Sequence, residues 1–300
     1  MAKVIVVFGA TGMQGGGVAQ GLLKNKNFEV RAVTRNPQSD KAKALEKQGA
    51  KLVEGNLNDP ESLANILPGS HGVFLVTSFY ELRDSNKELQ QGKNVVDACK
   101  AAGVKHMIFS GVDDVTSITG KACPSADSKF AIENYMFASG VPSTAVRYPF
   151  YADNYLDPSK VMAKKDDKGT FVIGLPMEGK KQDLLSISSA GNAVAAIFAA
   201  PDTYIGKTVG LNGDRKTIPE CAEILCKHLA PKTFKAGEVT AEQLGNFGFP
   251  GAGRVEALFT FFQRDDLIYN VEFTKQLDPS NMSFEDWVKA NKDALNAAYQ

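Results

Sequence analysis

The stretch from Val4 to Gly17 restricts the possible folds of this chain more than any other segment. It begins with five consecutive apolar residues, Val4 to Phe8, and continues through glycines at Gly9, Gly12 and Gly15. Five β-branched or aromatic residues in a row are typical of a strand buried on both faces, as in a parallel sheet. Because a helical pattern follows the last glycine, the stretch predicts a strand, a tight turn and a helix.

Each glycine of this turn has its own physical reason. Gly9 lets the chain turn sharply off the strand, Gly12 leaves room for a pyrophosphate against the backbone, and Gly15 lets the helix pack closely on the strand. The helix N-terminus adds free N–H groups and the positive end of the helix dipole. The spacing is G-x-x-G-x-x-G, one residue longer before the second glycine than G-x-G-x-x-G. We predict cofactor contacts from the whole turn: Gly9, Ala10, Thr11, Gly12, Met13, Gln14 and Gly15.

A glycine-rich turn without a ligand is the alternative interpretation of these residues. The strand before the turn and the helix after it favour the phosphate site, because that is the context in which such glycines bind dinucleotides.

Strands and helices alternate through the first half of the chain, which predicts right-handed βαβ units around a parallel sheet. The expected strands are 4–8, 28–34, 51–54, 72–77, 105–110 and 142–147, and the expected helices are 14–24, 39–47, 61–67, 85–102 and 126–139. The second half is less regular, with a hairpin in 164–179, strands at 184–187 and 209–212, and helices at 189–200, 218–229, 241–246, 253–263 and 284–291. The fold class predicted is α/β, a Rossmann-type doubly wound parallel sheet with a smaller C-terminal α/β lobe. The core would cover 1–153, with 184–202 returning to it, and most of 154–300 would form the lobe.

Composition excludes several classes of function. The 300 residues contain 34 basic and 34 acidic side chains, so no footprint for direct nucleic-acid binding or for a membrane surface is visible. No apolar run approaches the ~20 residues of a membrane span, and we expect no cleavable leader before the first strand. Three histidines and four scattered cysteines, with no C-x-x-C pair, give no metal-ligand spacing. We expect a reducing compartment, the cytoplasm or the nucleus.

The end of the second expected strand predicts which dinucleotide is bound. NAD-binding folds place an acidic residue there for the ribose 2′-OH, whereas an arginine accommodates a 2′-phosphate. This chain has T-R-N-P-Q-S at 34–39, with no carboxylate. Arg35 offers a planar fork of donors to a phosphate, so NADP(H) is predicted over NAD(H), with Asn36 and Ser39 beside it. An ordinary solvated helix start is the alternative.

Two further loops follow strands, at the edge where open α/β sheets bind ligands. Asn56 and Leu57 end the third strand and would flank the adenine. Thr77, Ser78 and Phe79 end the fourth and would lie along the ribose of the nicotinamide half. Without the glycine turn, both loops could equally be plain connections.

Several motifs together resemble a known family. They are G-A-T-G-M-Q-G at 9–15, V-T-R-N-P at 33–37, F-S-G at 109–111, D-S-K at 127–129, R-Y-P-F-Y-A-D-N at 147–154 and G-F-P-G at 248–251. Over nearly the whole chain they are similar to the NmrA-like family of atypical short-chain dehydrogenase/reductases, and most similar to its animal NADPH-sensor branch. The resemblance implies a Rossmann core with a small lobe, NADP(H) binding and, in some members, a change of oligomeric state or partner with the cofactor.

The resemblance also implies roles for single residues. Active short-chain enzymes carry Tyr-x-x-x-Lys, in which the lysine binds the ribose and lowers the pKa of the tyrosine. Here Lys129 matches the lysine, but Ser125 stands where the tyrosine is expected, and a serine hydroxyl is a poor proton donor. Ser110 matches the family's Ser/Thr position. The family's site further implies cofactor contacts from Gln90 and from the loop Tyr151, Ala152, Asp153 and Asn154. Tyr80, Tyr148 and Tyr151 remain candidates to replace the absent tyrosine.

Two functions follow as hypotheses. The first is an NADP(H)-binding redox sensor and regulator with little or no dehydrogenase turnover, whose protein partners or self-association, for example as a homodimer, respond to the cofactor. Its lobe has two aromatic runs for such contacts, 247–250 and 258–262, although plain core packing is the simpler interpretation for most of them. The second is an NADPH-dependent reductase of the isoflavone- or quinone-reductase type, in which Lys129 would be the catalytic base or would only hold the cofactor. A direct DNA-binding regulator is least favoured, given the neutral charge.

Overall fold

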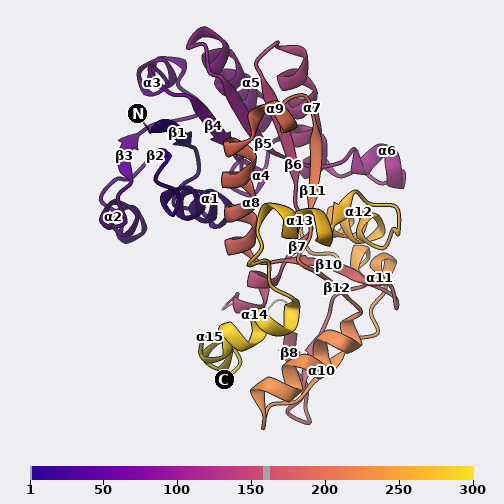
Figure 1. Ribbon diagram of the computed structural model, residues 1–300. Coiled ribbons are helices and arrows are strands. Elements are labelled where there is room, and N and C mark those ends of the chain that lie inside the picture. The colour runs from indigo at the N-terminus through magenta and orange to yellow at the C-terminus, as the bar shows by residue number, and fades with distance from the viewer. Residues whose placement is uncertain (1, 158–162) are drawn as a thin grey trace.

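The apolar run near the N-terminus forms β1 (Lys3–Val7), which lies inside a large sheet (Figure 1). The computed structural model describes residues 2–157 and 163–300. Within those residues one sheet has eight strands, all paired in parallel. In spatial order they are β14 (Tyr269–Asn270), β11 (Thr208–Leu211), β6 (Ser143–Arg147), β5 (His106–Gly111), β4 (Gly72–Leu75), β1, β2 (Phe28–Thr34) and β3 (Lys51–Glu54).

The strand order identifies the fold class. The chain builds outward from β1 to β2 and β3, then crosses back to β4 and continues to β5 and β6. This reversal beside β1 is the topological switch point of a doubly wound sheet, where such folds bind dinucleotides. The predicted Rossmann-type α/β fold is therefore confirmed. Two strands from the second half of the chain, β11 and β14, extend the same sheet beyond β6.

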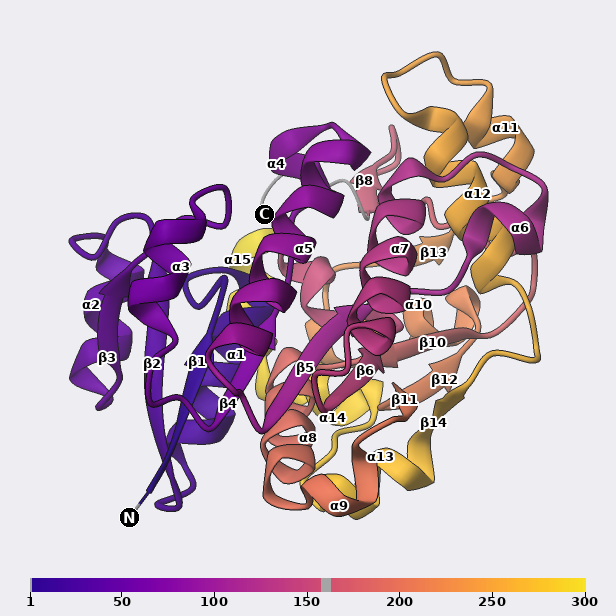
Figure 2. The same cartoon turned by 90° about the horizontal axis from the view of Figure 1, so that it is seen from above.

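Helices cover both faces of this sheet. They are needed because successive side chains of β1 point to opposite faces and are apolar on both. Ile5 and Val7 belong to the core on one face, whereas Val6 and Phe8 belong to the core on the other. Figure 2 shows α5 and α7 on one side of the strands and α8 on the opposite side. The first face is covered by α1 (Met13–Leu23), α2 (Asp40–Lys47) and α8 (Ile187–Ala199), and the second by α3 (Pro60–Ile66), α5 (Ser85–Ala101) and α7 (Pro124–Ala138).

The helix that carries the N-terminal glycines packs against α8 through a contact between backbones. A Cβ placed on Gly191 would lie 2.0 Å from the carbonyl oxygen of Gly17, and one on Gly21 would lie 2.4 Å from the carbonyl carbon of Gly191. No real Cβ fits at such distances, so the glycines on both helices set how closely they approach. The helix predicted over 189–200 thus packs on α1 as well as on the sheet.

Substituting Gly191 by alanine is expected to destabilise the protein by about 1–3 kcal/mol, because the new methyl group meets rigid backbone and the two helices must separate. Gly253→Ala is the matched control. Its Cβ would meet no atom within 4 Å among the described residues, so the same change should be neutral or stabilise by about 0.4–1 kcal/mol. Urea unfolding of both variants measures the difference. Equal stabilities would contradict the packing described here.

The rest of the chain forms two small sheets and a further hydrophobic core. One sheet joins β7 (Phe150–Tyr151), β10 (Gln182–Leu185) and β12 (Asp214–Lys216), and the other joins β8 (Ala163–Lys165), β9 (Phe171–Ile173) and β13 (Phe234–Ala236).

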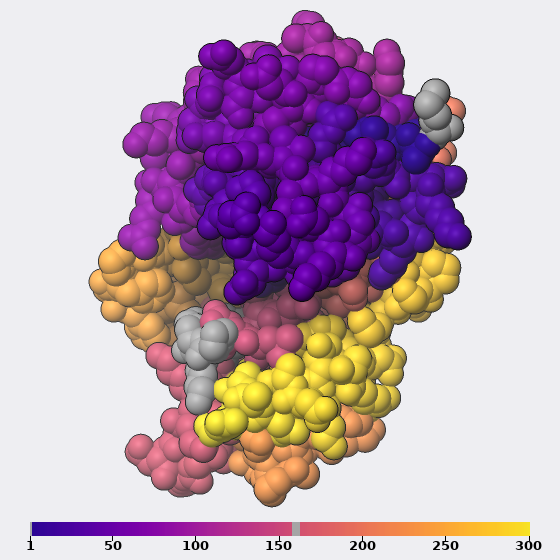
Figure 3. Space-filling view, turned by 90° about the vertical axis from the view of Figure 1, so that its left-hand side faces the viewer, coloured from indigo at the N-terminus to yellow at the C-terminus, as the bar shows by residue number. Residues whose placement is uncertain are grey.

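The remaining helices are α4 (Phe79–Leu82), α6 (Val115–Thr119), the 3₁₀ helix Ala152–Leu156, α9 (Pro201–Tyr204), α10 (Ile218–Leu229), α11 (Ala241–Gly245), α12 (Ala252–Phe262), α13 (Val271–Leu277), α14 (Phe284–Ala290) and α15 (Lys292–Ala298). Figure 3 shows the N-terminal part above and the yellow C-terminal helices below.

Most predicted elements are present, and the differences have a common cause. The helix predicted over 218–229 is observed with the same bounds, and the expected hairpin pairs β8 with β9. The elements that the sequence pattern missed are short, such as α4, α6 and β14, and a single turn or two residues show no periodicity. Among the described residues, no helix is both long and apolar enough to cross a membrane.

Candidate dinucleotide-binding site

The glycine turn after β1 has the closed geometry that its spacing predicts. Gly9 has a φ of 67°, and the Gly12 amide donates a hydrogen bond of 2.9 Å to the Gly9 carbonyl oxygen. A Cβ on Gly15 would lie 2.3 Å from that same oxygen. The turn can therefore close only with glycine at this position, and α1 begins directly against the end of the strand.

The N-terminus of α1 fits an anion. Its N-cap residue is Gly12, and in the part of the chain that the structure describes no side chain caps the helix and no acidic residue lies in its first turn. By contrast, α2, α5 and α8 are capped by the side chains of Ser39, Asp84 and Ser186. The first amide groups of α1 are thus left for a ligand, as a phosphate of a dinucleotide requires. Around them Ala10 is buried, Thr11 is half-buried and Met13 is exposed.

Gln14 connects this turn to the end of β5. The hydroxyl of Ser110 donates a hydrogen bond of 2.7 Å to Gln14 Oε1. Gln14 lies in the first turn of α1, just after β1, whereas Ser110 lies in β5, and β4 separates β1 from β5. Gln14 and Ser110 therefore lie together at the carboxyl end of the sheet.

The residues after β2 divide into two kinds. Asn36 and Ser39 shape the chain locally: Asn36 Oδ1 accepts a 3.0 Å hydrogen bond from the Gln38 amide, and Ser39 caps α2 by accepting from the Ala42 amide. Arg35 instead extends into solvent, and its Nη2 lies 3.0 Å from Glu81 Oε2 of α4. A phosphate at Arg35 would meet a guanidinium that already has a carboxylate beside it.

The loop after β3 is tied to α5. Asn94 donates a 2.9 Å hydrogen bond from its amide to the Leu57 carbonyl oxygen and accepts one of 2.8 Å from Gln90. Asn56 Oδ1 accepts from the Asn58 amide at 3.0 Å and so holds the turn. Two predicted residues, Leu57 and Gln90, are thereby linked through Asn94, whereas Asn56 stabilises its own turn.

Lys129 is held by groups of the protein. Its ammonium donates to the Thr77 carbonyl oxygen at 2.8 Å, to Thr77 Oγ1 at 3.0 Å and to the carboxylate of Glu88. A lysine ammonium has three N–H donors, and these three acceptors use all of them. A neutral amine has only two N–H groups, so the surroundings fit the charged form. Burial lowers the pKa of Lys129, and the Glu88 carboxylate opposes that shift.

Glu88 is the residue of this group that the sequence analysis missed. Its side chain is fully buried and also accepts a hydrogen bond from the Ser128 hydroxyl. A signal for it existed. Position 88 of α5 is in register with Gly92, Val95 and Val96, which form the buried face of the helix. A carboxylate in a buried stripe needs a cation nearby, and the nearest candidate in the family motif is Lys129.

Ser125 occupies the position of the absent tyrosine, and the three tyrosines that could replace it differ in burial. Ser125 is buried, and its hydroxyl lies 3.7 Å from the thiol of Cys123. Burial raises the pKa of Tyr148 and of Tyr151, whereas an active tyrosine needs a lowered pKa. Tyr80 is 66 % exposed, and its hydroxyl accepts a 2.9 Å hydrogen bond from Arg254.

The loop after β6 joins the site to α8. Asp153 accepts a 2.9 Å hydrogen bond from the Ile187 amide at the start of α8, and burial raises the pKa of its carboxyl group. Ala152 is buried, and Asn154 lies beside it in the 3₁₀ helix. The hydroxyl of Tyr151 is buried, with no hydrogen-bond partner among the described residues.

A second buried ionic group lies at the ends of β5 and β6. Arg147 pairs with Asp113 and, at 2.9 Å, with Glu133 of α7. Burial raises the pKa of both carboxyl groups, and the single arginine opposes both shifts. Sequence reasoning placed Arg147 only inside a motif and missed its two partners.

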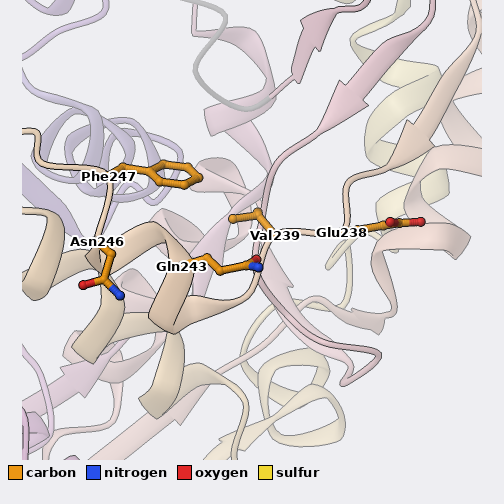
Figure 4. Close-up of a pocket in the computed structure, with 5 residues that line it drawn as sticks. All are labelled: Glu238, Val239, Gln243, Asn246 and Phe247. Atoms are coloured by element: carbon orange, nitrogen blue, oxygen red, sulfur yellow. The ribbon is translucent and has the colours of Figure 1, made fainter.

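A surface hollow of about 650 Å³ lies away from this site, between α11 and the strand-like segment before it. It is lined by Glu238, Val239, Gln243, Asn246 and Phe247 (Figure 4). None of these residues belongs to the predicted cofactor set. The hollow therefore adds nothing to the dinucleotide site.

Known proteins resemble this chain in sequence and in fold. The model of the NmrA-like family matches residues 1–288. An NmrA-like family domain-containing oxidoreductase, notA′ from Aspergillus versicolor, is 35 % identical over 240 residues, which cover 73 % of this chain and 67 % of that protein. The crystal structure of NmrA, a negative transcriptional regulator, in complex with NADP has a TM-score of 0.78 at 21 % identity and covers 96 % of this chain and 94 % of that one. The triphenylmethane reductase of Citrobacter sp., complexed with NADP(H), has a TM-score of 0.75 at 23 % identity, covering 97 % and 99 %.

Proposed function

The chain belongs to the NmrA-like family, and we propose that it is an NADP(H)-binding redox sensor with little or no dehydrogenase turnover. The cofactor would occupy the switch point of the sheet, with its phosphates at the first turn of α1. When bound, NADPH would supply a hydride to a substrate, but no described residue of this site is placed to supply the accompanying proton. The protein would act by presenting different surfaces with and without the cofactor.

NADP(H) binding is supported by the turn and by Arg35. The uncapped, acid-free N-terminus of α1 fits a pyrophosphate. Arg35 supplies a planar donor fork at the strand end where dinucleotide folds distinguish the 2′-phosphate. Related proteins of this fold carry NADP or NADP(H) in their crystal structures.

One observation carries the proposal of little turnover: all three donors of Lys129 are used by Thr77 and Glu88. A saturated ammonium has no lone pair with which to accept a proton, and it can reach a ribose only by giving up one of these partners. Ser125 adds no acid, since its buried hydroxyl faces a thiol. The site is therefore equipped to hold a nicotinamide cofactor and poorly equipped to move a proton.

A sensor must also change a contact when the cofactor binds, since a ligand shifts an equilibrium only by its differential affinity for two states. The two aromatic runs of the lobe differ in this respect. Phe259 and Phe261 are buried, whereas Phe247 and Phe249 are 63 % and 42 % exposed. We propose the segment 247–250 as the contact with a protein partner or with a second copy, in the cytoplasm or the nucleus.

A reductase is the second candidate, and the names of the relatives favour it. The A. versicolor relative is an oxidoreductase, and the Citrobacter neighbour is a reductase. In this reading Lys129 would position the cofactor, and hydride donation alone would complete the reaction.

Three measurements on the purified protein separate these functions. We expect NADPH to bind more tightly than NADH, and Arg35→Ala to remove most of that preference, roughly a tenfold loss for NADPH, because a charge-assisted contact to the 2′-phosphate disappears. We expect no NADPH oxidation above background with quinones or phenolic ketones, while sedimentation or partner capture differs between the apo, NADP⁺ and NADPH forms.

The cofactor assignment and the sensor role can be rejected independently of each other. Equal affinities for NADPH and NADH, unchanged by Arg35→Ala, would reject the assigned cofactor. Turnover that Lys129→Ala abolishes would establish the reductase, and an identical oligomeric state and partner affinity in all three forms would reject the sensor.

A further inference from the structure

The ion pair between Arg35 and Glu81 crosses the predicted cofactor site. Arg35 directly follows β2, and Glu81 lies in α4, the first helix after β4. Both strands pair with β1, one on each side. The pair therefore spans the carboxyl end of β1, which is where the glycine turn and the N-terminus of α1 begin.

A second contact holds α4 in this place. The hydroxyl of Tyr80 accepts a 2.9 Å hydrogen bond from Arg254 of α12, and the guanidinium of Arg254 lies 4.8 Å from the centre of the Tyr80 ring. α4 has no buried residue among those that the structure describes, so these two contacts with arginines fix it more than core packing does. The contact of Tyr80 with Arg254 thus keeps the adjacent Glu81 within reach of Arg35.

We propose that Glu81 is an internal competitor of the cofactor's 2′-phosphate for Arg35, and that it sets how strongly the chain prefers NADP(H) over NAD(H). This rests on the proposed function, since it assumes that Arg35 binds the 2′-phosphate. The guanidinium has a limited set of donors, and Glu81 Oε2 already lies 3.0 Å from one of its nitrogens. A phosphate ester brings a charge of about −1.5 to −2, so it competes with the Glu81 carboxylate for the same guanidinium.

The exposure of the pair makes the competition reversible. The side chains of Arg35 and Glu81 are 72 % and 55 % exposed. Exposed pairs of this kind change an equilibrium constant by no more than about fivefold, so a phosphate can displace the carboxylate. The effect acts only on the phosphorylated dinucleotide, because NAD(H) has a hydroxyl in place of the 2′-phosphate. Glu81 therefore lowers discrimination without lowering dinucleotide binding in general.

Titration of NADPH and NADH into wild type and Glu81→Gln tests the proposal. We expect NADPH to bind about three- to fivefold more tightly to the variant at low salt, with NADH unchanged and the gain shrinking as salt is added. Glu46→Gln is the matched control, since Glu46 pairs with Lys43 on α2 at 3.4 Å and is 52 % exposed. In an Arg35→Ala background, Glu81→Gln should have no effect on NADPH.

The outcomes distinguish this inference from the proposed function. If wild type prefers NADPH but Glu81→Gln leaves its affinity unchanged, or tightens NADPH and NADH equally, the competition is rejected while the cofactor assignment stands. If Glu81→Gln acts equally with and without Arg35, the carboxylate does not work through that residue. If wild type fails to bind NADPH, the proposed function itself is wrong.

Discussion

Replacing Glu88 by alanine is expected to lower the free energy of unfolding of the apo protein by about 3–5 kcal/mol, because the buried Lys129 ammonium loses its only carboxylate partner among the described residues. Glu88 is fully buried, so water cannot replace it. The loss would be a large share of the about 5–15 kcal/mol by which domains are stable. Urea unfolding followed by circular dichroism measures it.

A double variant identifies the cause of that loss. Glu88→Leu with Lys129→Met removes both charges and keeps apolar volume, so it should be much more stable than either single variant. Glu46→Ala, which breaks an exposed pair with Lys43, should change stability by less than about 1 kcal/mol. Additive effects of the two buried substitutions would show that Glu88 and Lys129 are not coupled.

Gly15→Ala is expected to reduce NADPH affinity by at least about a hundredfold, since at least two charge-assisted contacts of the phosphates with the turn are lost. The new Cβ would lie 2.3 Å from the Gly9 carbonyl oxygen and 2.8 Å from that of Phe8. Both atoms are backbone, so the turn must open and the amide groups at the start of α1 must move.

Thermal unfolding with and without NADPH measures this effect even if the variant is less stable. A bound ligand raises the stability of the folded state, so wild type should gain stability from NADPH and Gly15→Ala should not. Gly16→Ala is the matched neighbour, because its Cβ would lie 3.1 Å from a single carbonyl oxygen, that of Ala10, and should cost far less. Equal stabilisation of both variants by NADPH would overturn the assignment of the turn.

The features that the sequence predicted correctly are encoded locally. The strand, turn and helix at the N-terminus follow from one continuous stretch, and α10 begins at a capping box formed by Thr217 and Glu220, with Pro219 in its first turn. The parallel, doubly wound character of the sheet followed from the alternation of strands and helices. None of these inferences depends on which distant segments of the chain are in contact.

The features that the sequence did not predict depend on contacts between distant segments. The partner of Lys129 lies 41 positions away on another helix, and only the packing of α5 on α7 brings them together. The pairing of Arg35 with Glu81 required both the position of α4, too short to show a pattern, and the order of β4, β1 and β2. A charged residue among the buried positions of a helix indicates that a partner of opposite charge exists, but it does not identify that partner.

The contact between α1 and α8 also determines at what point of synthesis the fold can be completed. Gly191 is translated 174 positions after Gly17, a delay of roughly 9 to 35 seconds at 5–20 residues per second. Throughout that time the glycine face of α1 and the apolar sheet face beside it have no cover. The N-terminal segment of the nascent chain therefore stays incompletely packed until α8 is made. A pause or truncation before residue 187 would leave the part of the sheet face that α8 covers exposed to aggregation.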